Sequence, residues 1–85
     1  MHSKTVKVGS SVGLHARPAA IISEAAGELD SEVTLALAGE EPVDAASSLL
    51  IMTLGASCGD SVEVSGDDQA AVDTIAALVE KDLDA

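Results

Sequence analysis

The residue types that can do chemistry gather in one short stretch, residues 13–20 (GLHARPAA), just before a long run rich in Ala and Ile. Proline fits the first turn of a helix, because the N–H that it lacks would have no intrahelical partner there. We therefore expect His15 at or next to an N-cap, with a helix that begins at Ala16. A nucleophilic imidazole beside an oxyanion site is what accepting a phosphoryl group requires.

The start of this helix is a predicted anion site. The backbone N–H groups of Ala16 and Arg17 should lack intrahelical partners, and with the positive end of the helix dipole they favour a phosphate. The same end disfavours a second positive charge, so we expect the His15 imidazole to be neutral and to keep a free lone pair. The Arg17 guanidinium can bind two phosphate oxygens at once. A histidine that merely caps a helix is the alternative, and the residue types favour the chemical interpretation.

A second stretch of interest is residues 46–55 (ASSLLIMTLG). Ser47 is suited to the N-cap of a short helix, and Gly55 is suited to the position after the end of that helix. The run between them is more apolar than one buried face of so short a helix requires. Some of its apolar side chains are therefore candidates for exposure.

The pattern allows Leu50 and Leu54 to point inward while Leu49 and Met52 lie outside, near His15. Exposed apolar side chains beside a reactive group would indicate a docking surface. The alternative, in which all of these side chains belong to the core, fits the pattern equally well.

Residues 13–19 (GLHARPA) resemble the active-site motif of HPr, the histidine-containing phosphocarrier family of the phosphoenolpyruvate-dependent sugar phosphotransferase system. The resemblance covers essentially the whole chain, and the sequence is particularly similar to acidic members from actinobacteria. It implies that His15 accepts a phosphoryl group from phospho-Enzyme I, through the ring Nδ1 atom, and passes it to sugar-specific IIA domains. Arg17 would stabilise the phosphate, and the Ala16 and Arg17 amides would cradle it.

The resemblance also implies a contact surface next to the histidine, for which we predict a docking rim of Ala20, Leu49 and Met52. Ser47 falls on the position of a regulatory phosphorylation site found in many low-GC Gram-positive members. Ala46 replaces a common lysine there, and Ser48 replaces an apolar residue. We therefore expect Ser47 to be a structural cap rather than a modified residue.

Two other functions share parts of this prediction. A regulatory phosphocarrier paralogue would use the same chemistry outside sugar transport, and an anion-binding module would use only the helix end. An autonomous enzyme is disfavoured, because no carboxylate lies near His15 in the sequence to orient it. We expect a phosphoryl carrier that needs neither a metal nor a cofactor.

The composition restricts the class of protein further. The 85 residues predict a single domain over 1–85, and 47% hydrophobic residues predict that it folds. A net charge of −11 and the lack of Phe, Tyr and Trp argue against nucleic acid or an anionic membrane as a partner. The lone Cys58 offers neither an internal disulfide nor metal-ligand spacing. With no signal peptide or apolar span, we expect a cytoplasmic protein. We also expect it to be a monomer.

The hydrophobic periodicity predicts an α+β fold. Strands are expected over 4–8, 32–37, 43–45 and 61–64, and helices over 16–27, after Ser47, and over 69–83. Ser10 and Ser11 fall in the loop before the motif, where they could help to hold a phosphate, but we expect solvated side chains. The pattern alone does not exclude a ferredoxin-like arrangement. The resemblance implies an open-faced β-sandwich, with an antiparallel sheet in the order one, four, two, three covered on one face by three helices.

Overall fold

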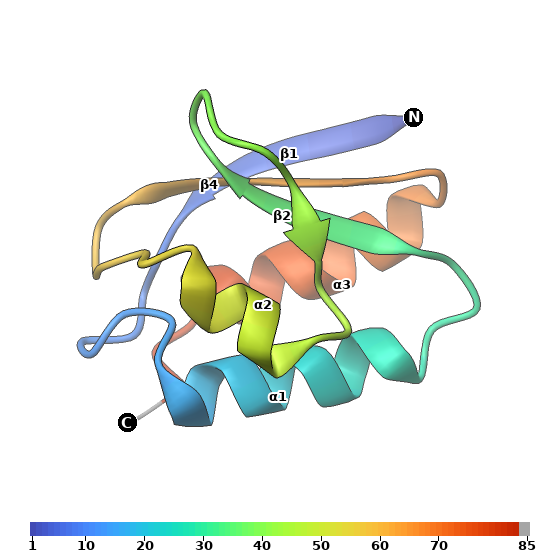
Figure 1. Ribbon diagram of the computed structural model, residues 1–85. Coiled ribbons are helices and arrows are strands. Elements are labelled where there is room, and N and C mark those ends of the chain that lie inside the picture. Colours follow the sequence, from blue (N-terminus) through green and yellow to red (C-terminus); the bar gives the residue numbers. More distant parts are fainter. Residues whose placement is uncertain (84–85) are drawn as a thin grey trace.

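A computed structural model of the chain describes residues 1–83, in which four strands and three helices alternate in the predicted order. The strands pair in the spatial order β1-β4-β2-β3, and every pair is antiparallel (Figure 1). The elements are β1 (His2–Lys7), α1 (Ala16–Gly27), β2 (Val33–Leu37), β3 (Val43–Asp44), α2 (Ser48–Thr53), β4 (Ser61–Gly66) and α3 (Gln69–Glu80).

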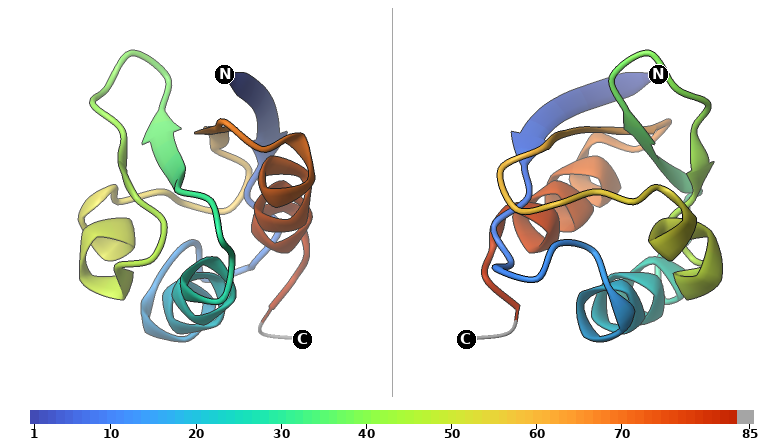
Figure 2. Two further views of the ribbon diagram at one scale, coloured as in Figure 1. Left: turned by 90° about the vertical axis from the view of Figure 1, so that its right-hand side faces the viewer. Right: turned by 60° about the vertical axis from the view of Figure 1, so that its left-hand side comes forward.

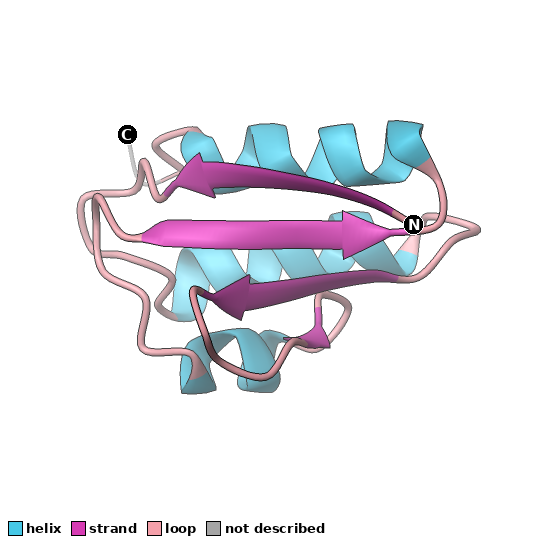
Figure 3. Cartoon of the chain, turned by 90° about the horizontal axis from the view of Figure 1, so that it is seen from above, coloured by secondary structure: helices cyan, strands magenta, loops and turns pink. Residues whose placement is uncertain are grey.

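The sheet has one covered face and one open face. Val6 of β1 pairs with Val62 of β4, and Val64 of β4 pairs with Leu35 of β2, so these four apolar side chains point to the same side and are buried. All three helices lie on that side (Figure 2), and the opposite face carries no helix (Figure 3). The predicted open-faced α+β sandwich and its strand order are confirmed.

The long helices are held by apolar stripes with helical spacing. Ala19, Ile22 and Ala26 of α1 are buried, as are four residues of α3, namely Val72, Ile75, Ala76 and Val79. With Ile51 of α2, they complete a core that is entirely aliphatic, as the composition requires.

The last helix is shorter than predicted. We expected it to continue to Leu83, but α3 ends at Glu80 and Lys81 is extended, with ψ 147°. The chain leaves the helix here because it bonds to the loop before His15: the Gly9 N–H donates to the Val79 carbonyl at 3.1 Å. Leu83 is half-buried against the core from this extended segment rather than from the helix.

Candidate active site at the start of helix α1

His15 is the N-cap of α1, as predicted. Its backbone is extended (φ −83°, ψ −165°), its side chain makes no capping hydrogen bond, and the residue is exposed. Its carbonyl oxygen accepts the first helical hydrogen bond, from the Ala19 N–H at 2.9 Å. The imidazole is therefore presented at the surface and is not occupied in holding the helix.

Three consecutive backbone N–H groups at this helix end are open. Within the described part of the chain, those of His15, Ala16 and Arg17 have no hydrogen-bond partner. Pro18 contributes no N–H, so Ala19 is the first residue whose amide is engaged in the helix. Unpaired amides at the positive end of a twelve-residue helix are able to stabilise an anion, as the predicted site requires.

Arg17 lies in the first turn of α1 and is exposed. No ion pair or hydrogen bond joins its guanidinium to another residue between positions 1 and 83. It is thus available to a ligand, and its fork of N–H donors suits phosphate oxygens.

The loop before His15 is held against the loop after α2. Gly13 has φ +74°, and a Cβ there would lie 2.4 Å from the Ala56 carbonyl oxygen. That close approach, which only glycine allows, brings the Leu14 N–H to the same oxygen at 3.0 Å. The Leu14 side chain is buried, so the residue immediately before the histidine is fixed by both its backbone and its side chain.

Helix α2 packs beside α1 (Figures 1 and 2). It carries exposed apolar side chains. Leu49 is 68% exposed and Met52 is 38% exposed, as the docking hypothesis requires. The expectation that Leu50 points inward is wrong, because it is 40% exposed. Ile51 occupies the buried position instead, since a helix of six residues has room for little more than one inward-facing side chain.

Ser47 is the N-cap of α2, as predicted. Its hydroxyl oxygen accepts a hydrogen bond from the Leu50 N–H at 3.3 Å. Ala20, the third residue assigned to the docking rim, is exposed on α1, one turn beyond Ala16.

Ser10 is a second residue near the site that sequence analysis placed wrongly. We expected a solvated side chain, but it is fully buried and hydrogen-bonded to the segment that follows α3. Nothing in the local sequence signals this, because the segment that covers it is more than 70 residues away along the chain. Ser11 is exposed, as expected.

The sequence segments that contain His15 and helix α2 are poor in formal charge. Residues 8–23 and 45–59 together carry one charged side chain, Arg17, whereas all 15 acidic residues lie in other parts of the sequence. The first acidic residues beyond these segments are Glu24, Asp44 and Asp60. The two segments are therefore poor in carboxylates and partly apolar within a strongly acidic molecule, although the Asp60 carboxylate accepts from the Ser57 N–H at 2.9 Å, close to Gly13.

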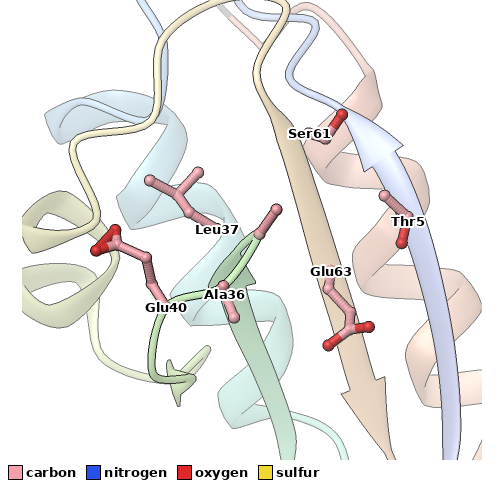
Figure 4. A pocket seen from close by; sticks show the side chains of 8 residues that line it. Thr5, Ala36, Leu37, Glu40, Ser61 and Glu63 are labelled. Carbon is pink, nitrogen blue, oxygen red and sulfur yellow. The ribbon is translucent and has the colours of Figure 1, made fainter.

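A shallow hollow at the open face of the sheet is separate from this site. Thr5, Ser61 and Glu63 line it together with the turn at Gly39 and Glu40 (Figure 4). None of the residues predicted to act in phosphoryl transfer or docking contributes to its wall.

In the described residues, no three His, Cys, Asp or Glu side chains are grouped as a metal site would require. No helix between positions 1 and 83 has the length and apolar character needed to cross a membrane.

Comparison with known proteins gives consistent matches over nearly the whole chain. Residues 2–81 match the family model described as "PTS HPr component phosphorylation site". The chain is 40% identical over 87 residues to phosphocarrier protein HPr of Streptomyces coelicolor, a match that covers 99% of this chain and 94% of that protein. It is 41% identical over 70 residues to phosphocarrier protein HPr of Treponema pallidum, which covers 80% of this chain and 78% of the relative.

A solved structure supports the same relationship. The crystal structure of a phosphocarrier protein HPr from Bacillus anthracis superposes with a TM-score of 0.84 at 28% sequence identity. The superposition covers 92% of this chain and 95% of that chain.

Proposed function

Since this chain belongs to the HPr family and is a phosphocarrier of the phosphotransferase system, we propose that His15 is the residue that carries the phosphoryl group. The observation that carries this proposal is the position of His15, which is an exposed N-cap beside three open amides. Partners in this system include Enzyme I and IIA domains. The HPr relatives favour this role over a regulatory paralogue or a module that only binds anions.

In the proposed reaction, the Nδ1 lone pair of His15 attacks the phosphorus atom of the group held by phospho-Enzyme I. The N–P bond to Nδ1 forms as the bond to the donor breaks, and the electron pair of that bond stays with Enzyme I. Transfer to a IIA domain is the same exchange with His15 as the leaving group. The geometry supports Nδ1, because it is the ring nitrogen nearer the backbone and its open amides.

The roles of the neighbouring groups follow from charge. The transferred group carries negative oxygens, which the amides of Ala16 and Arg17 and the Arg17 guanidinium can stabilise. These groups are exposed, so the phosphorylated state is stabilised without being enclosed. A shallow site of this kind suits a carrier, because a group that is bound too tightly is slow to leave. The proposed chemistry uses no metal and no cofactor.

We assign docking to the apolar rim formed by Ala20, Leu49 and Met52. Exposed apolar side chains in segments whose one charged side chain is Arg17 fit a partner surface that is itself apolar and poor in charge. A partner that depends on a ring of basic residues would find only Arg17 here. We infer that apolar burial, rather than ion pairing, supplies most of the affinity of the complexes.

The assignment is tested by incubating the protein with phosphoenolpyruvate and Enzyme I and measuring its intact mass. We expect a gain of one phosphate that is acid-labile and absent in His15→Ala. Retention of the full gain in His15→Ala would overturn the assignment. A wild-type protein that binds inorganic phosphate but gains no mass would be an anion-binding module.

We also propose that residues 1–85 act as one domain, as a monomer in the cytoplasm, where phosphoenolpyruvate is available. Light scattering after gel filtration tests the monomer, and cell fractionation tests the location. Ser47 is assigned a structural role only.

A further inference from the structure

We propose that Ser10 is a positioning residue for His15, because its buried hydroxyl ties the segment after α3 to the loop that presents the imidazole. The inference rests on the proposed function of His15. Ser10 is the only polar residue that is buried in the described part of the chain. Its Oγ donates to the Lys81 carbonyl at 3.4 Å and accepts from the Leu83 N–H at 3.1 Å.

The backbone next to Ser10 is fixed to the same segment. The Gly9 N–H donates to the Val79 carbonyl oxygen at 3.1 Å. A Cβ on Gly9 would lie 1.9 Å from the Glu80 carbonyl oxygen, so the loop and the end of α3 are in direct backbone contact. The Ser10 hydroxyl adds a side-chain bond to this contact from inside the protein.

From Ser10 the constraint continues toward the histidine. The Ser10 carbonyl oxygen accepts from the Gly13 N–H at 2.9 Å, which closes the turn that contains the exposed Ser11 and Val12. The next residue, Leu14, bonds to Ala56 on the other side. The loop before His15 is therefore held at two points, and Ser10 is the point farther from the ring.

Loss of the Ser10 hydroxyl weakens one of these two points, where only the Gly9–Val79 backbone bond remains, and leaves the Leu83 N–H without its partner in a part-buried place. We infer that the loop before His15 would then shift relative to the helix, and the ring with it. Because displacements of about 1 Å can slow a reaction by up to ~100-fold, we expect roughly tenfold slower transfer in Ser10→Ala. The docking side chains on α1 and α2 are unchanged in this variant. When the protein is the acceptor substrate of phospho-Enzyme I, the effect should therefore appear in kcat rather than in KM.

The test follows phosphoryl transfer from phospho-Enzyme I in full-length variants at a temperature where all of them are folded. Ser10→Ala removes the hydroxyl, and Leu83→Pro removes the N–H that donates to it. Leu83→Ala keeps that N–H while losing the same side chain, so it controls for packing. Ser61→Ala makes the same chemical change as Ser10→Ala on the open face of the sheet, away from the candidate site.

We expect Ser10→Ala and Leu83→Pro each to lower kcat by roughly tenfold, with little further loss in the double variant, because both remove the same bond. Leu83→Ala and Ser61→Ala should stay within about twofold of wild type. The ¹H–¹⁵N ring signals of His15 should move in Ser10→Ala and stay in place in Ser61→Ala. All the variants should still reach one phosphate per chain.

A wild-type kcat in Ser10→Ala, or losses that multiply in the double variant, would overturn the positioning role. Neither result would affect the assignment of His15, which fails only if the wild-type protein takes up no phosphate on that residue.

Discussion

The Leu14 N–H donates a hydrogen bond to the Ala56 carbonyl oxygen, with 3.0 Å between the two atoms. This bond joins the residue before His15 to the loop that leaves α2, the helix with the exposed apolar side chains. The proposed phosphoryl acceptor and the proposed docking surface thus belong to one connected unit. A partner that binds α2 meets a histidine whose position relative to that helix is already set.

Gly13 is the residue that makes this connection possible, and replacing it tests the connection. Gly13→Ala should lower the free energy of unfolding by about 2–5 kcal/mol, because it adds a strained positive φ to a clash with Ala56. Urea denaturation measures the loss. Gly39→Ala is the matched control, since Gly39 has φ +80° but nothing within 4 Å of an added Cβ. The free energy of unfolding of Gly39→Ala should fall by only about 1–2 kcal/mol. An equal fall in the two variants would contradict a close approach at Gly13.

Arg17→Ala should slow phosphoryl transfer by roughly 10- to 100-fold, the loss expected for a charged hydrogen bond to the transferred group. The side chain is exposed and unpaired within residues 1–83, so stability should change by no more than about 0.5 kcal/mol. Rapid-quench kinetics and urea denaturation separate the two quantities. Arg17→Lys keeps the positive charge but loses the paired N–H donors of the guanidinium, so its transfer rate should fall between those of wild type and Arg17→Ala. Lys4→Ala should transfer at the wild-type rate. An unchanged rate in Arg17→Ala would exclude the proposed role.

Leu49→Asp should weaken binding to Enzyme I by at least about tenfold, because a charge would replace an apolar contact that is buried in the complex. Calorimetric titration measures the affinity. Ala77→Asp adds the same charge at an exposed position of α3 and should leave binding almost unchanged. If both variants bind equally weakly, the cause is the added net charge and Leu49 is not in the interface.

Ser47→Ala should destabilise the protein by about 1 kcal/mol, because the Leu50 N–H loses its capping partner. Thermal or urea unfolding measures the change. The adjacent Ser48→Ala is the control, since Ser48 lies inside α2 and makes no capping bond; it should stay within about 0.5 kcal/mol of wild type. A larger loss in Ser48→Ala than in Ser47→Ala would contradict the assigned cap.

Local signals predicted most of the elements and the outline of the site. Pro18 and the glycine before His15 place the start of α1, and Ser47 and Gly55 bracket α2, because capping and turn preferences act over a few residues. Alternation and helical spacing predicted the strands and the apolar stripes. The strand order came from the family resemblance, since periodicity alone left a ferredoxin-like sheet open.

The errors concern positions whose environment comes from distant segments. Ser10 is buried by residues that follow α3, and the same contact ends α3 earlier than its apolar spacing predicts. Within α2, an all-apolar run does not indicate which side chain turns inward, and the structure selects Ile51 rather than Leu50. Both outcomes depend on tertiary packing, which a local pattern does not contain.

The acidic residues are unevenly distributed along the chain, and this affects how the protein is oriented as it approaches another molecule. A protein with its negative charge concentrated away from one surface experiences a torque in an external field. Near any negatively charged body, the orientation of lowest repulsion directs the carboxylate-poor segments that carry His15 and Arg17 toward that body and the acidic remainder away from it. The scarcity of carboxylates in these segments would thus help to align the carrier before contact.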